Sequence, residues 1–509
     1  MKFNQTQRGS NRTTNYEGAE AYTLSFKEEL YAAVAATALS DTFYESADSR
    51  LTRIQELVRV VAARDAQFVA KLAVYTRQQM HLRSVPLVLL VELAKVHSGD
   101  DLIRRTTRQV VQRADEITEL LAYYQQANGR SGTKRLHRLS KQLQRGLADA
   151  FNRFDEYQFA KYNRDGEVKL RDALFLVHPK AKDETQQQIF DRIASNSLKT
   201  AYTWETELSR TGQEVSEEDE EAKRAAFREQ WETLVRSGKM GHMALLRNLR
   251  NLLRADVSEE VLELVAQRIA DPEQVRRSRQ FPFRFYAAYR ELEGVSHACV
   301  ATFLQALDDA MTASAANIAG FAPEDRVAIF TDVSGSMHTN LSRRSSMQYY
   351  EVGLVLSALF RRTVKLAYTG LFGEDFRMVQ TNPRNGVLSN VRRLSKVNVG
   401  QSTNGYKAIK HLLENGIMVD KVLIFTDCQL WNSNWGSNET IAQYWKHYQH
   451  FFPEAKLYLF DLAGYGNTPI STHGSQVKLI AGWSDKVFDM LDAMENGSSA
   501  VKEIERVEI

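Results

Sequence analysis

The stretch RVAIFTDVSGSM, residues 326–337, decides the fold of the last third of this 509-residue chain. Its segment Val327–Val333 is rich in β-branched residues and has no helical period, so it predicts a buried strand. Asp332, Ser334 and Ser336 stand at the end of that strand. A spacing of two in an extended segment points all three side chains the same way. We therefore expect a polar cluster at the end of this strand.

The sequence after this strand alternates between helix-like and strand-like segments. In chain order these are a helix at 347–363, a strand at 364–373, a helix at 404–416, strands at 421–427 and 456–464, and a final helix from about Trp483. Such alternation predicts a parallel sheet with helices on both faces. Because Pro323 and charged residues directly precede the first strand, we place a domain boundary at residue 322.

Two further residues are expected to join this polar cluster. Thr403 lies in the loop GQSTNG before a predicted helix, and Asp427 ends the strand KVLIFTD. Ligands of open parallel sheets gather at the carboxyl ends of the strands. The cluster then supplies two carboxylates and three hydroxyls, which are hard oxygen donors that favour Mg²⁺ or Mn²⁺ over zinc or copper. The predicted cation ligands are Asp332, Ser334, Ser336, Thr403 and Asp427.

Each hydroxyl residue taken alone is also consistent with a structural role. Ser334, Ser336 and Thr403 could each cap a helix. Their order, D-x-S-x-S followed by a loop threonine and a strand-end aspartate, resembles the metal-ion-dependent adhesion site of von Willebrand A domains at every position. Such a site usually leaves one coordination position for a partner's carboxylate. A magnesium phosphatase would instead need a second carboxylate two residues after its nucleophilic aspartate, where Ser334 stands, so we do not expect an enzyme.

Composition excludes several classes of protein. The 66 basic and 63 acidic residues nearly balance, which excludes a histone-like polycation but not a local basic surface. The two cysteines, Cys299 and Cys428, exclude a disulfide framework or a cysteine-ligated zinc site. The N-terminus is polar, and no run approaches the roughly 18 apolar residues of a membrane span. We expect a cytoplasmic protein with no membrane association.

The first 300 residues show a helical pattern from about Ser25 to Ala316. The clearest helical segments are 49–77 and 241–254, where apolar residues recur at steps of three and four, and 85–96, an almost wholly apolar segment that is typical of a buried helix. A succession of short helices predicts a solenoid of HEAT-type repeats. The expected domains are a flexible arm at 1–20, a helical repeat region at 21–322 and a von Willebrand A domain at 323–509.

The segment Gly129–Lys182 is the most basic part of the chain, with 13 Lys or Arg against 6 Asp or Glu. Basic residues that follow phosphates and rings that stack on bases are typical of single-stranded nucleic-acid binding. Charged solvent-facing surfaces and aromatic core residues would give the same composition, so both interpretations stay open. The interleaved rings are Phe151, Phe154, Tyr157, Phe159 and Tyr162.

Four stretches in the helical part resemble the Ro autoantigen family, in which a TROVE module precedes a von Willebrand A domain. They are KYNRDGEVKLRDALFLVHPK (161–180), GHMALLRNLRNLL (241–253), RQFPFRFYAAYREL (279–292) and ALDDAMTASAANI (306–318). The similarity runs from about residue 20 to 509, and the chain's divergence from the animal pattern suits a bacterial or phage member. The resemblance implies a ring of helical repeats closed by the von Willebrand A domain.

The resemblance also implies a function. Ro proteins bind small non-coding Y RNAs on the ring's outer surface and single-stranded ends of misfolded RNAs in its hole. They act in RNA quality control and stress survival, in bacteria sometimes beside polynucleotide phosphorylase or another nuclease. They have no known catalytic activity. Two rival functions remain for this chain: a protein-interaction module or co-chaperone without RNA, and a magnesium-dependent phosphoryl-transfer enzyme.

Carrying the family's RNA contacts over gives six candidate residues. Lys161 and His178 match the family's lysine and histidine. Asp165 stands in the column of the family's arginine, so its neighbour Arg164 is the nearest candidate. Without the resemblance, we would interpret His178 as a loop histidine held extended by the following proline. The full set is Lys161, Arg164, His178 and Lys180, with Arg77 and Arg83 as candidates for the hole or its rim.

Overall fold

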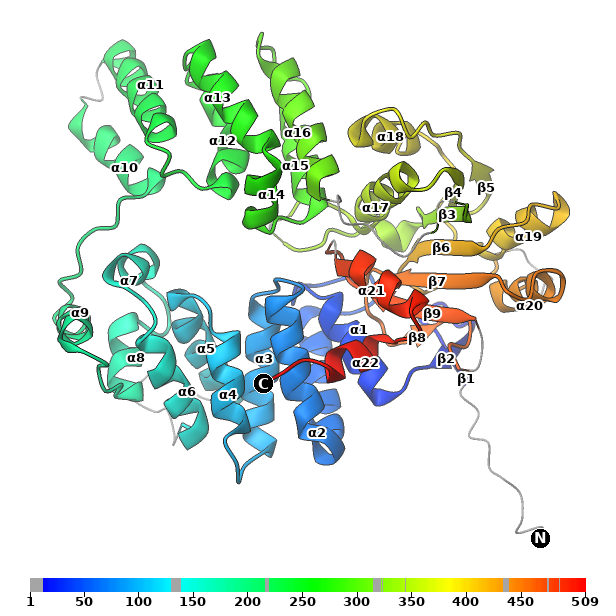
Figure 1. The fold of residues 1–509 in the computed structure, drawn as a ribbon, viewed down its shortest axis with the longest axis horizontal. Coiled ribbons are helices and arrows are strands. Elements are labelled where there is room, and N and C mark those ends of the chain that lie inside the picture. The colour runs from blue at the N-terminus through cyan, green and yellow to red at the C-terminus, as the bar shows by residue number, and fades with distance from the viewer. Residues whose placement is uncertain are drawn as a thin grey trace. The chain divides into compact units, whose positions relative to one another are not determined.

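The computed structural model describes residues 12–509 except 130–138, 216–218, 315–321, 323, 344, 434–438, 474–475 and 485. The chain forms two compact units (Figure 1). The first contains Met1–Leu57 and Asn317–Glu503, and the second contains Val58–Ala316 and Ile504–Ile509. Among the described helices, none combines the length and the apolar character needed to cross a membrane.

The first unit is built on a six-stranded sheet in the order β5-β4-β3-β6-β7-β9. All neighbouring strands are parallel except β4 and β5, which are antiparallel. The predicted α/β domain is therefore confirmed, although the sequence interpretation missed β5 and β9. The strands are β3 (Arg326–Asp332), β4 (Leu366–Phe372), β5 (Phe376–Met378), β6 (Lys421–Thr426), β7 (Lys456–Asp461) and β9 (Val477–Ala481).

Helix α17 is the central helix of this unit. It packs against β3, β4 and β6, and nearly all of its residues are buried. Gly353 makes this close packing possible, because a Cβ atom there would lie only 2.8 Å from the Thr331 side chain on β3. The helices of the unit's α/β part are α17 (Tyr349–Thr363), α18 (Val387–Leu394), α19 (Tyr406–Glu414), α20 (Ile441–Phe451) and α21 (Lys486–Glu495).

The N-terminal segment belongs to this same unit. β1 (Arg12–Thr14) pairs with β2 (Glu20–Thr23), and β2 pairs with β8 (Asn467–Thr468), all antiparallel. Helix α1 (Phe26–Ala35) then packs on β9. The expectation of a flexible arm at 1–20 is therefore wrong for residues 12–20, because β1, β2 and the turn between them are joined by backbone hydrogen bonds. Residues 1–11 of that arm lie outside the described part of the chain.

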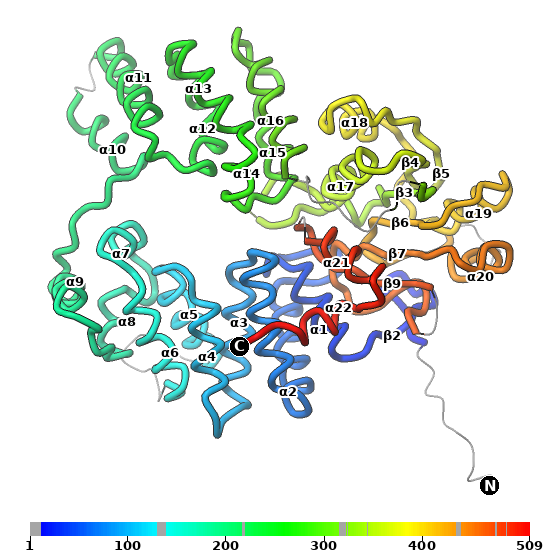
Figure 2. The backbone as a smooth tube through the Cα atoms, in the orientation of Figure 1, coloured from blue at the N-terminus to red at the C-terminus, as the bar shows by residue number. Residues whose placement is uncertain are grey.

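The second unit is helical, and its described residues contain no strand. Helices close in sequence pack together, as α3 does with α5, α4 with α6 and α13 with α16; Figure 2 traces this succession from blue to green. Its helices are α3 (Ser84–Val96), α4 (Leu102–Val110), α5 (Ala114–Ala127), α6 (Lys141–Phe151), α7 (Glu156–Tyr162), α8 (Leu170–Val177), α9 (Glu184–Ala194), α10 (Trp204–Glu214), α11 (Glu220–Arg236), α12 (His242–Arg254), α13 (Glu259–Ala270), α14 (Pro272–Ser278), α15 (Pro282–Leu292) and α16 (Val300–Ser314).

Two helices cross from one unit to the other. They are α2 (Ala47–Gln78) and α22 (Ala500–Glu505). α2 is interrupted at Asp65, whose φ of −151° and ψ of 78° are not helical. The Asp65 carboxylate accepts a hydrogen bond of 2.9 Å from the backbone N–H of Phe68 and so caps the second half of the helix. The segment 49–77, predicted as one helical run, is therefore two helical pieces.

Candidate metal site and RNA-binding residues

The two predicted aspartates stand at the ends of neighbouring strands. β3 and β6 are parallel with Thr331 opposite Phe425, so Asp332 and Asp427 reach the same edge of the sheet. Both carboxylates are buried. The edge is the carboxyl end of the strands, where open parallel sheets bind their ligands.

Each aspartate is held by hydrogen bonds that leave part of its carboxylate to face the site. Asp332 accepts bonds from the Thr426 hydroxyl (2.7 Å) and from the backbone N–H of Ser334 (2.9 Å). Asp427 accepts one through Oδ1 from the backbone N–H of Gln429, at 3.0 Å. These bonds fix the orientation of both carboxylates before any ligand arrives.

Three buried oxygen atoms at this edge have no hydrogen-bond partner among the described residues. They are the hydroxyls of Ser334 and Ser336 and the Oδ2 atom of Asp427. A buried polar group without a partner costs about 1–3 kcal/mol, and more when it is charged. Such a concentration of unsatisfied oxygens requires an explanation. A bound divalent cation satisfies them at once, so the donor set fits the hard cation expected from the sequence.

Thr403 is brought to the same place by loop contacts. The backbone N–H of Gly335 donates to the carbonyl of Gln401, at 2.8 Å. The Thr403 hydroxyl accepts a bond of 3.2 Å from the backbone N–H of Trp431, and Thr403 is buried. Thr403 and Ser336 line one cavity of about 300 Å³. The structure therefore brings all five predicted ligands together.

A third carboxylate lies beside this cluster and was missed in the sequence. Asp461 ends β7, the neighbour of β6, and is fully buried. It accepts bonds from the backbone of Ala463 (3.0 Å) and Gly464 (2.7 Å), while its Oδ2 has no partner. The strand KLYLFD ends in aspartate, as KVLIFTD does, so the same pattern could have identified it.

The electrostatics of this edge favour a bound cation. Burial raises the pKa of Asp332, and the charge of Asp427 raises it further. Burial likewise raises the pKa of Asp427, and that of Asp461 to about 7. A divalent cation would offset both the burial and the mutual repulsion. In the ranges that the structure describes, no three His, Cys, Asp or Glu side chains form a metal-binding group, so the hydroxyls must contribute.

Among the RNA-binding candidates, Lys161 and Arg164 lie together. Both are exposed, and they line one pocket of about 390 Å³ on the second unit. Lys199 lines it as well, although it lies outside the basic segment and nothing in the sequence pointed to it. The Lys161 ammonium lies 5.8 and 5.6 Å from the ring centroids of Tyr157 and Tyr162. We call this group of cations and rings the basic pocket.

His178 and Lys180 lie at the end of α8. Both are exposed, as expected. His178 is not extended but left-handed, with φ 49° and ψ 54°, because its N–H donates to the Leu174 carbonyl and closes the helix. The extended conformation expected before a proline is therefore wrong here. α5 packs against both α7, which carries Lys161, and α8.

Arg77 does not lie on the surface. Its side chain is 7% exposed and forms an ion pair of 2.8 Å with Glu116, whose side chain is fully buried. It cannot reach a phosphate without breaking that pair. Contrary to the expectation from the sequence, Arg77 is therefore not placed to contact RNA. Arg83 is 45% exposed and pairs with Asp115 at 2.8 Å.

The aromatic residues of the basic segment divide between core and surface. Phe151, Phe154 and Phe159 are buried against one another and support the structural interpretation. Tyr157 is 46% exposed beside Lys161 and supports the RNA-binding one. Residues 130–138, which hold several of the basic side chains, lie outside the described residues.

Comparison with known families agrees with this combination of a helical unit and a von Willebrand A-type site. A family model described as TROVE domain matches residues 27–230 and 213–300, more than half of the chain. A second, described as Ro60 vWA domain, matches residues 326–494. The chain therefore belongs to the Ro family of TROVE-domain proteins.

The individual proteins that this chain resembles share 19–26% of the aligned residues with it. The crystal structure of the Ro (RSR) protein of Deinococcus radiodurans aligns with a TM-score of 0.59 and 19% identity, covering 93% of this chain and 100% of that one. Telomerase protein component 1 is 26% identical over 51% of this chain in Rattus norvegicus and over 48% in Mus musculus. The alignment covers 12% of either telomerase component, so this chain spans a small part of those relatives.

Proposed function

We propose that this chain is the protein scaffold of a ribonucleoprotein and that its helical unit binds RNA at the basic pocket. The observation that carries the proposal is the grouping of Lys161, Arg164 and Lys199 around one pocket beside the exposed ring of Tyr157. Cationic side chains bind phosphates, and an exposed ring stacks on an unpaired base. Membership of the Ro family supports the same function.

The finer parts of the proposal follow from the family resemblance. We propose a small Y-like RNA on the outer surface of the helical region, contacted by Lys161, Arg164, His178 and Lys180. Single-stranded ends of misfolded RNA would enter the central hole of the ring. The role would be RNA quality control and stress survival in the cytoplasm, beside polynucleotide phosphorylase or another nuclease, without catalysis by this chain.

The first unit would add a binding site for a divalent cation, most simply Mg²⁺. Asp332, Ser334, Ser336, Thr403 and Asp427 would hold it. When bound, the cation supplies a positive charge able to take an oxygen ligand from a carboxylate. The protein's own groups orient the donors, and the packing around them buries Asp332, Asp427 and Asp461 at the ends of β3, β6 and β7. This is recognition chemistry rather than group transfer, because Ser334 stands where a phosphatase of this kind needs a second carboxylate as its general acid.

RNA binding is tested with two RNAs that share a hairpin, one with a single-stranded tail and one blunt. The tailed RNA should bind more tightly in a filter-binding assay, and affinity should fall steeply with salt because phosphate contacts release counterions. Lys161→Ala with Lys199→Ala should weaken binding roughly tenfold. Arg277→Ala is the control, since it removes an exposed charge that does not line the pocket. Equal binding of both RNAs, or no RNA binding, would favour the protein-interaction module instead.

A further inference from the structure

The turn between β1 and β2 has a fixed conformation. The Asn15 side chain is buried, and its carbonyl oxygen accepts bonds from the backbone N–H groups of Glu17 (3.1 Å) and Ala19 (2.9 Å). The backbone N–H of Gly18 donates to the Asn15 carbonyl, at 3.0 Å. Gly18 has a φ of +78°, which a residue with a side chain rarely adopts. Glu17 is therefore held at a defined place.

This turn is attached to the loop that carries a predicted cation ligand. The Asn15 amide donates to the Leu430 carbonyl at 2.8 Å, and the Tyr16 N–H donates to the Gln429 side chain at 2.9 Å. Gln429 in turn donates its backbone N–H to Asp427. The N-terminal turn and the Asp427 loop thus form one hydrogen-bonded structure within the first unit.

The carboxylate of Glu17 faces the cation site. Glu17 lines the same cavity as Ser336 and Thr403, and it accepts a hydrogen bond from the Tyr44 hydroxyl. Gly335, which stands between Ser334 and Ser336, lines that cavity too. A further negative group beside buried carboxylates is unfavourable unless a cation lies among them.

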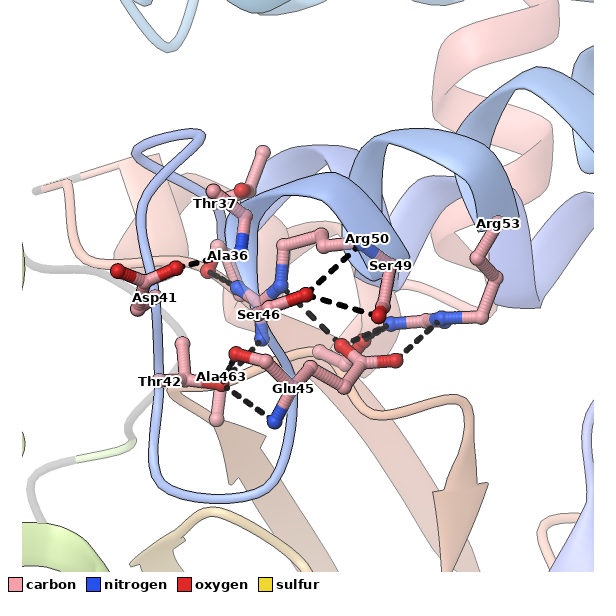
Figure 3. A network of polar contacts seen from close by, with 12 residues as sticks. Ala36, Thr37, Asp41, Thr42, Glu45, Ser46, Ser49, Arg50, Arg53 and Ala463 are labelled. Carbon is pink, nitrogen blue, oxygen red and sulfur yellow. Dashed lines mark hydrogen bonds and ion pairs between the residues drawn. The ribbon is translucent and has the colours of Figure 1, made fainter.

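Tyr44 directly precedes Glu45, which lies in the network of polar contacts shown in Figure 3. Glu45, its neighbour, is paired with Arg50 at 3.2 Å and with Arg53 at 2.9 Å. Glu45 also accepts a bond of 3.2 Å from the Tyr16 hydroxyl. The rings of Tyr16 and Tyr44 stack with centroids 5.2 Å apart. The turn, through Glu17, and the Tyr44 loop therefore border the cavity together.

We propose that Glu17 is a supporting carboxylate supplied by the chain itself, which takes the place at the mouth of the cation site that an external carboxylate would otherwise take. The inference rests on the proposed cation site and is independent of RNA binding. An incoming carboxylate would have to displace the turn, at the cost of the Asn15 and Tyr16 contacts. The site is then closed to partners until the N-terminal turn moves.

The test measures Mn²⁺ affinity of the full chain by calorimetry and by electron paramagnetic resonance, with and without acetate. Glu17→Ala should weaken Mn²⁺ binding roughly tenfold or more, the usual range for losing a supporting group at a metal site. Acetate should restore most of that affinity, because it fits the vacated position. The wild type should not respond to acetate. Glu17→Gln should lose affinity without acetate rescue, because the amide still fills the position.

Two controls separate this role from general charge effects. Glu20→Ala removes an exposed carboxylate of the same hairpin, and Glu374→Ala removes another carboxylate that lines the cavity. Neither should gain a response to acetate. Equal Mn²⁺ affinity of wild type and Glu17→Ala, or an equal acetate response in the wild type, would overturn the proposal. A wild type that binds no Mn²⁺ would overturn the cation site itself, and the role of Glu17 with it.

Discussion

The two candidate sites of this molecule would bind their proposed ligands by opposite physical means. The cation site is buried, and its oxygens are oriented in advance and left short of partners. The basic pocket is exposed, and its lysine and arginine side chains are already solvated. The first site depends on geometry, so the loss of one of its five proposed ligands should act strongly, whereas the second depends on summed charge and should lose affinity gradually. Substitutions should therefore act abruptly in one unit and in small steps in the other.

The largest effect is expected for Asp332→Ala. Removing one of two carboxylates should abolish Mg²⁺ binding, since Mg²⁺ parts with its water reluctantly and needs charged donors. RNA binding should persist, because the proposed RNA contacts belong to the other unit. Calorimetric titration of Mg²⁺ beside an RNA shift assay measures both. Undiminished Mg²⁺ binding would refute the ligand assignment, and a matching loss of RNA binding would refute the independence of the two sites.

A large effect on stability is expected for Arg77→Ala. The substitution leaves the fully buried carboxylate of Glu116 without its 2.8 Å partner. Breaking a buried pair in this way costs about 3–5 kcal/mol. Chemical denaturation should show this loss, and the double variant Arg77→Met with Glu116→Leu should recover much of it because no charge stays buried. If Arg77→Ala were as stable as the wild type but bound RNA more weakly, Arg77 would instead have to contact RNA.

The clustering of the five proposed cation ligands could be predicted from the sequence because their positions follow from local patterns. Spacing of two after a strand places Asp332, Ser334 and Ser336 together, and a parallel sheet brings in Asp427. Glu17 could not be found in this way, because its position depends on β2 pairing with β8, more than 400 residues later. No spacing within the N-terminal segment indicates that pairing.

The candidate RNA-binding residues were harder to place from the sequence because charge alone does not determine whether a side chain is exposed. Arg77 and Arg83 look alike in sequence, yet only Arg77 meets a buried glutamate 39 residues further along the chain. The three buried phenylalanines of the basic segment likewise could not be separated from Tyr157 by composition. The helical class of this unit was predictable, because apolar periodicity is local. The identity of its surface depends on tertiary packing.

A moderate effect is expected for Lys161→Ala combined with His178→Ala. Both side chains are exposed, so stability should change by no more than about 0.5 kcal/mol. Affinity for a small structured RNA should fall roughly tenfold, since each lost contact at a phosphate backbone contributes a modest share. Thermal melting and a filter-binding assay check the two parts. A much lower melting temperature would place one of these residues in the folding core, and unchanged affinity would remove them from the interface.

The smallest effect is expected for Arg83→Ala, the exposed counterpart of Arg77. Its ion pair with Asp115 has side chains 45% and 24% exposed, so water and salt screen the attraction. Exposed pairs of this kind contribute about 0–1 kcal/mol, and Asp115 keeps a second partner in Arg113 at 2.9 Å. The free energy of unfolding should therefore stay within about 1 kcal/mol of the wild type in a denaturant titration. RNA affinity should fall only slightly at low salt, because Arg83 does not line the basic pocket and would act on RNA only through its electric field. Dissolved salt screens that field, so the difference from the wild type should vanish as the salt concentration rises. A loss of RNA binding as large as that of the Lys161 and His178 variant would show that Arg83 contacts RNA directly and would extend the interface to the start of α3.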